Sequence, residues 1–177
     1  MGQELVKVFE FDDTTLFYGT GNVVWTAATD RIGKTGIGTY SPAGTRLNVA
    51  SAEDGTNDGV WVVTSVVNAD TVCVGVGSTV TGNLDDDGAV ILGETADDFV
   101  RMDFYSRVVG IINSDQDVTV KLRWGSLLDG SGVNVDVSYA VTGGTPLSIA
   151  SEILAPYLRV RIINNDTSTA TLSGFFW

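Results

Sequence analysis

The sequence predicts an all-β protein, and three observations lead to this fold class. Short runs in which apolar and polar residues alternate recur along the whole chain, whereas almost no segment has helical periodicity. Val and Thr are frequent throughout, and their β-branched side chains suit a pleated sheet. Glycine is abundant, at 21 residues, and proline is scarce, at 3, which favours strands joined by tight turns. With 177 residues, the chain is long enough to bury a substantial core.

The predicted strands of the first half follow one another closely. In order, they are ELVKVFEF (4–11), NVVWTA (22–27), TRLNVAS (45–51), GVWVVTSVV (59–67), TVCVGV (71–76) and AVIL (89–92). Turn sequences such as EDGTNDG (53–59) separate them. Short strands with this punctuation predict a small β-barrel-like domain over residues 1–90.

The second half continues with longer runs. They are FVRMDF (99–104), RVVGIIN (107–113), DVTVKLRWGS (117–126), VNVDVSYAV (133–141), PLSIASE (146–152), PYLRVRIIN (156–164) and TATLSGFFW (169–177). These runs predict an antiparallel β-sandwich, jelly-roll or Ig-like, over residues 91–177. The acidic, glycine-containing segment TGNLDDDGAVILGETADD (81–98) at mid-chain is typical of a domain boundary.

Alternation along two of these strands predicts a basic outward face. In DVTVKLRWGS, Lys121 and Arg123 share the face opposite the apolar residues. In PYLRVRIIN, Tyr157, Arg159 and Arg161 do the same. One interpretation is that these cations pair with neighbouring acids across strands. The other is that these five residues form a patch that docks on an acidic protein surface.

The C-terminal GFFW is unusually apolar for a chain end, since free termini are commonly frayed and polar. The last two runs predict a hairpin that closes the sandwich across NNDTS (164–168). Phe176 and Trp177 are therefore expected either in the core of this subunit or against a neighbouring subunit. They complete the predicted set of partner-binding residues.

Charge and composition exclude several function classes. The formal net charge is −12 and there is no histidine. Nucleic-acid binding is not expected, because it requires a concentrated basic footprint. Without histidine there is no Ser-His or Cys-His pair, and nothing distinguishes a catalytic carboxylate pair from acidic turn residues. We therefore predict that the protein is not an enzyme.

One segment fits part of the spacing of a calcium loop. NLDDDGAVILGE places oxygen ligands at its first, third, fifth and twelfth positions and glycine at its sixth. The candidate ligands are Asn83, Asp85, Asp87 and Glu94. No flanking helices are expected, and Asp residues before Gly also form ordinary turns. Calcium is therefore a possible cofactor, and no other is predicted.

The N-terminal MGQELVKVFEF contains no long apolar segment, so neither a signal peptide nor a membrane span is expected.

The aromatic residues Trp25, Tyr40, Trp61 and Tyr139 could line a sugar-binding face, although most aromatic residues of a β-sandwich lie in its core.

Two stretches resemble β modules of tailed-bacteriophage virion proteins. The first is YSPAGTRLNVASAEDGTNDGVWVVTSVVNADTVCV (40–74), with its NDG turn and its GVWVVTSV strand. The second extends from RVVGIINSDQDVTVKLRWGSLLDGSGVN (107–134) to EILAPYLRVRIINND (152–166), with its SDQ turn and its APY strand. The RWGSLLDGSG loop and the first 30 or so residues depart from the pattern.

This resemblance implies a structural protein of the virion, made in the host cytoplasm. We expect a capsid decoration (cement) protein that binds the major capsid protein on the outer head surface, as a homo-oligomer and preferentially as a trimer. A tail or neck component and a carbohydrate-binding module of a receptor-binding protein are the alternatives.

Overall fold

The structure is a computed structural model that describes residues 9–52, 57–75, 80, 85–86, 89–95, 99–128 and 132–177. It is built almost entirely of antiparallel strands, which confirms the predicted all-β class. The helical elements whose bounds the structure gives are one 3-10 turn, η1 (Ala27–Thr29), and one four-residue helix, α1 (Ile37–Tyr40).

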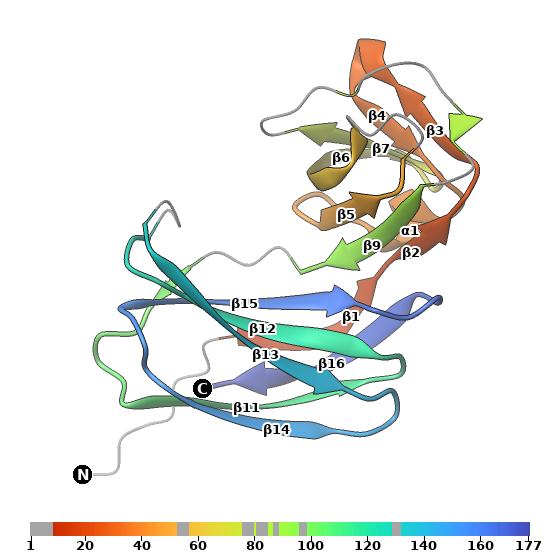
Figure 1. Cartoon of the computed structure of the whole chain (residues 1–177). Helices are drawn as coiled ribbons and strands as arrows, with labels where there is room; N and C mark the ends of the chain where they lie inside the picture. The colour runs from red at the N-terminus through yellow and green to blue at the C-terminus, as the bar shows by residue number, and fades with distance from the viewer. Residues whose placement is uncertain are drawn as a thin grey trace. The chain divides into compact units, whose positions relative to one another are not determined.

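The chain divides into two compact units (Figure 1). The sandwich unit comprises the described residues within 1–14, 97–162 and 171–177, and the sheet unit those within 15–96 and 163–170. This differs from the predicted division at residue 90. The first strand of the chain belongs with the second half because it pairs with the last strand. Segment 163–170 belongs with the first half, where the Asn164 side chain donates to the Leu16 carbonyl oxygen (3.1 Å).

The sandwich unit has two sheets. One has the order β1-β16-β11-β14, and the other places β13, β12 and β15 side by side with the short β10 paired to β15. The bounds are β1 (Phe9–Leu16), β10 (Val100–Arg101), β11 (Arg107–Ser114), β12 (Val118–Gly125), β13 (Asn134–Val141), β14 (Leu147–Glu152), β15 (Tyr157–Asn164) and β16 (Ala170–Phe176). The ends of β1, β15 and β16 extend into the sheet unit.

Alternation along the strands of the sandwich unit positions its core. On β12, Val118, Val120, Leu122 and Trp124 are buried while the residues between them are half-buried. On β15, Leu158, Val160 and Ile162 are buried in the same way. The two sheets therefore bury their apolar faces and present alternate residues outward.

The sheet unit is a single run of paired strands. Its elements are β2 (Tyr18–Thr20), β3 (Val23–Thr26), β4 (Arg31–Gly33), β5 (Arg46–Ala50), β6 (Gly59–Asn68), β7 (Thr71–Gly75), β8 (Asp85–Asp86) and β9 (Val90–Glu94). β9 pairs with both β2 and β5, and the order then continues β5-β6-β7-β4-β3-β8. Among the described residues, β8 pairs with β3 and with no strand at the other edge, so the sheet is not closed into a barrel.

The inner face of this sheet carries its own core. Trp25 and Trp61 are nearly fully buried, with ring centroids 6.2 Å apart. The Trp61 indole N–H donates to the Asn57 carbonyl oxygen (2.9 Å). The core interpretation of these two tryptophans is confirmed, so they do not form an exposed sugar-binding face.

Candidate functional site

The structure brings the predicted basic residues onto one outward surface. We define the basic face as Lys121, Arg123, Tyr157, Arg159 and Arg161, all half-buried residues of β12 and β15. These strands are neighbours in the sheet. Because the inward residues of both strands are apolar and buried, the cations alternate to the outside.

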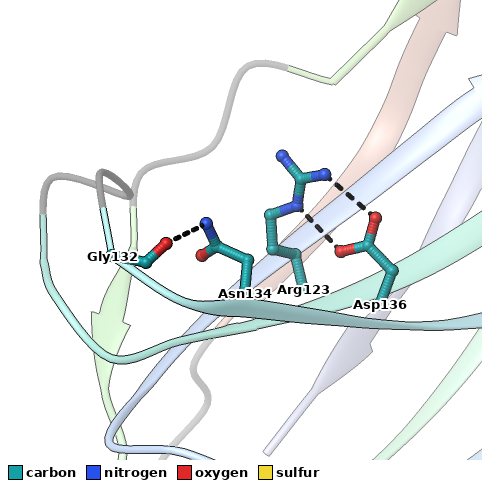
Figure 2. Close-up of polar contacts among 4 residues, drawn as sticks. All are labelled: Arg123, Gly132, Asn134 and Asp136. Atoms are coloured by element: carbon teal, nitrogen blue, oxygen red, sulfur yellow. Dashed lines mark hydrogen bonds and ion pairs between the residues drawn. The ribbon is translucent and has the colours of Figure 1, made fainter.

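Arg123 forms a bidentate ion pair across the sheet. It lies opposite Asp136 of β13, and its Nε and Nη2 donate to the two carboxylate oxygens at 2.8 and 3.0 Å (Figure 2). Both side chains are about one-third exposed, at 33%. This part of the basic face agrees with the interpretation of cross-strand pairing. Nearby, the Asn134 amide donates to the Gly132 carbonyl oxygen (2.9 Å).

The same carboxylate is influenced by two more cations of the face. The pKa of Asp136 is lowered, chiefly because its carboxylate accepts a hydrogen bond from Arg123. Partial burial raises the pKa and opposes this shift. The positive charges of Arg123, Arg161 and Lys121 lower the pKa further. Three cations of the basic face therefore lie around one acid.

Arg159 makes an aromatic contact at the same surface. Its guanidinium carbon lies 5.7 Å from the centroid of the Phe99 ring, a cation–π geometry. Tyr157 is half-buried and lies opposite Arg101 of β10. The basic face thus contains one aromatic residue, Tyr157, and contacts another, Phe99, through Arg159.

The sequence missed two residues of this arrangement. Asp136 could have been found, because the alternation in VNVDVSYAV places it on the polar side of a strand next to Arg123. Phe99 carried no such signal. It precedes a two-residue strand, and its partner Arg159 follows 60 residues later, so only tertiary structure shows the contact.

The C-terminal aromatic residues occupy two environments. Phe176 is fully buried and packs on Gly110, where a Cβ atom would collide with its ring. Trp177 is half-buried, and its backbone N–H and C=O each pair with Val109 at 2.9 Å. Its ring stacks on Phe175 with centroids 4.6 Å apart. Phe176 therefore belongs to this subunit's core, and the Phe175–Trp177 stack lies outside it.

The predicted calcium loop is only partly described. Asn83 and Asp87 lie outside the described residues, and Asp85 is described only as backbone in β8. Glu94 is fully buried on β9, opposite both Arg46 and Ile163. Among the described side chains, no group of three or more His, Cys, Asp or Glu could hold a metal ion. Calcium binding stays a prediction.

A cleft of about 340 Å³ lies on the outer face of β3, β4 and β7. Gly33 of β4 pairs with Val24 of β3 on one side and with Thr71 of β7 on the other. Because it has no side chain, it leaves the centre of this face open. Asp70 and Lys34 lie at its border, and each is held in place. The Asp70 carboxylate accepts from the Gly36 N–H (2.7 Å), and the Lys34 ammonium donates to the carbonyl oxygens of Thr20 and Gly21. The residues that line the cleft include no aromatic ring.

No helix in the described part of the chain has the length and apolar character needed to cross a membrane.

Comparisons with known proteins add little to this geometry. No protein-family model matches the chain, and no curated protein matches it. Among solved structures, the crystal structure of PirA matches with 18% identity and a TM-score of 0.39, covering 49% of this chain and 84% of that chain. Function therefore has to be argued from the residues of this chain.

Proposed function

We propose that this chain is a non-catalytic structural subunit of a tailed-phage particle, a decoration protein that binds the outer surface of the head. The sequence resemblance to virion modules is one support. The observation that carries the proposal is the basic face: Lys121 and Arg161 lie near an acid already paired with Arg123, and Arg159 stacks on Phe99.

The chemistry of the basic face suits an acidic protein surface. Arginine and aromatic residues are enriched at the centres of protein interfaces, and a few such residues supply most of the binding free energy. The face lies on paired strands, so little backbone entropy is lost when it docks. The net charge of −12 opposes indiscriminate aggregation of free copies.

The mechanism is binding alone. A subunit that spans neighbouring capsid proteins adds buried area across their junction. Separation of those capsid proteins then requires this additional area to be exposed, which raises its free-energy cost. The protein stabilises the head in this way without any turnover.

The test is co-sedimentation of the purified chain with the isolated heads, and separately with the isolated tails, of the phage whose genome encodes it. We expect the wild-type chain to sediment with heads. In Arg159→Gln/Arg161→Gln, loss of two anchor contacts should weaken binding about tenfold or more. The matched control is Thr64→Glu/Ser65→Glu, which lowers the net charge equally at exposed positions of β6.

Three results would contradict the proposal. Sedimentation with tails and not with heads would support a tail or neck component instead. Equal loss of binding in the control would mean that net charge, and not the basic face, determines affinity. Sedimentation with neither fraction would remove the virion function.

A second candidate function is carbohydrate binding, which the cleft on β3, β4 and β7 favours. Its border offers a carboxylate, an ammonium and hydroxyl groups at fixed positions, and these are groups that hydrogen-bond sugar hydroxyls. A glycan array checks this function. Binding that is lost in Thr71→Val, which removes one hydroxyl from the lining, would favour it over decoration.

A further inference from the structure

One end of the sandwich unit exposes large apolar side chains on three connections between strands. The described residues of these connections are 102–106 after β10, 126–128 and 132–133 after β12, and 153–156 after β14. The exposed side chains are Phe104 (80%), Leu127 (50%), Leu128 (59%), Val133 (78%) and Leu154 (51%). We call these five residues the loop end. Single exposed apolar residues are ordinary, but several on adjoining loops mark an interaction surface.

One hydrogen bond and one close approach place the three connections together. Met102 N–H donates to the Pro156 carbonyl oxygen (2.7 Å), which joins the connections after β10 and β14. A Cβ atom on Gly125, the last residue of β12, would lie 2.9 Å from the Phe99 ring, just before β10. Figure 1 shows all three connections at the same end of the unit. The loop end is therefore one surface.

Charged residues of both signs border this surface. Arg101 lies over the Phe104 ring, with its guanidinium carbon 5.7 Å from the centroid, and pairs with Asp103. Arg107, the first residue of β11, lies opposite Glu152, the last residue of β14. These four described residues, two cations and two acids, balance in charge.

We propose that the loop end is the contact between copies of this chain. Exposed apolar side chains need a covering surface, and a patch with balanced charges can pair with itself about a rotation axis, each cation meeting an acid of the neighbour. A strongly acidic or basic partner would find no matching excess of charge among the described residues of this surface.

This inference goes beyond the proposed function, because it requires no phage particle. It also separates two surfaces of one unit. The basic face on β12 and β15 would bind the head, and the loop end would join the subunits. A chain that self-associates but fails to bind heads would contradict the proposed function and leave this inference in place.

The experiment is the solution mass by light scattering during size-exclusion chromatography, repeated over a range of protein concentrations. The chain mass is 18.7 kDa, and we expect the wild type to elute at a multiple of it. Phe104→Ser/Val133→Ser should elute as a monomer. The control Val60→Ser/Val67→Ser removes exposed valines of β6 (45% and 42% exposed) and should keep the wild-type mass.

A monomeric wild type at every concentration would overturn the inference, as would an oligomer that persists in Phe104→Ser/Val133→Ser. Near-ultraviolet circular dichroism checks that this variant is folded, and the single variant Leu154→Asp provides a second, independent disruption. A wild-type monomer that instead sediments with phosphatidylcholine–phosphatidylserine vesicles would assign the loop end to a membrane surface, which also overturns the proposal.

Discussion

The two ends of the sandwich unit differ in the polarity of their exposed residues. At the turn end, which we define as residues 114–117 and 142–146, short polar turns are tied to one another. Asp117 accepts from the Gly143 N–H (2.8 Å), and Gly144 donates to the Ser114 carbonyl oxygen (2.7 Å). The Asp115 carboxylate accepts from the Thr171 N–H (2.7 Å). At the loop end, the connections carry exposed Phe, Leu and Val side chains.

This difference separates two roles within one fold, stability at the turn end and association at the loop end. Polar groups at the turn end are satisfied within the chain, so that end stabilises the sandwich and offers little to a partner. The five apolar side chains of the loop end are left in water, so these side chains contribute little to folding and can gain free energy from a neighbour. Substitutions at the turn end should therefore change stability, and those at the loop end should change association.

The largest expected effect comes from adding a methyl group at the turn end. In Gly143→Ala, the new Cβ would lie 2.8 Å from the Asp115 carbonyl oxygen and 3.1 Å from the Gln116 backbone, which cannot move without opening the turn. We expect the free energy of unfolding to fall by about 1–3 kcal/mol. Denaturant unfolding monitored by tryptophan fluorescence measures it.

The matched substitution at the other end is Gly132→Ala. There the new Cβ would meet the side chains of Ser126 and Leu127, which can rotate away, so a clearly smaller loss is expected. Equal losses at the two ends would remove the contrast between them.

A smaller effect should follow from deleting one acceptor at each end. Asp117→Ala leaves the Gly143 N–H without its partner and should cost about 0.5–1.5 kcal/mol. Asp103→Ala removes only the exposed ion pair with Arg101, so the melting temperature at low protein concentration, where the chain is monomeric, should stay unchanged, while the oligomer at high concentration weakens. Calorimetry and light scattering on both variants check this. A larger thermal loss in Asp103→Ala would contradict it.

The smallest effect concerns pH and the basic face. The folded pKa of Asp136 is lowered, so its contribution to stability is present above the unfolded value of about 3.9 and is lost as pH falls through the folded pKa. Its side chain is one-third exposed, so the contribution should be at most about 1 kcal/mol. Melting temperatures at neutral and acidic pH should differ less in Asp136→Asn than in the wild type. An unchanged difference would mean that Asp136 gains nothing from its cations.

The sequence predicted the class and the faces of the long strands, for a physical reason. Alternation over eight residues, as in β12, determines which side chains lie inside, and the structure confirms it. Short strands such as β2, β4 and β8 carry too few residues for a period to be read. The short α1 follows Gly36, whose φ of 80° is a local turn feature without helical periodicity.

The division of the chain and the surface contacts needed the structure. Pairing of β1 with β16 joins the two chain ends, and no local pattern predicts so distant a partner. The cations of the basic face could be named from alternation, but the acid that pairs with Arg123 and the ring under Arg159 depend on register. The loop end was missed because its apolar residues lie in connections, where alternation carries no information.

The most direct test of the contrast between the two ends is hydrogen–deuterium exchange of the full chain at low and high protein concentration. We predict that amides of residues 102–106, 126–128 and 153–155 exchange more slowly at high concentration, while residues 115–117 and 142–145 exchange at one rate throughout. Protection confined to the turn end, or no dependence on concentration at either end, would contradict the account.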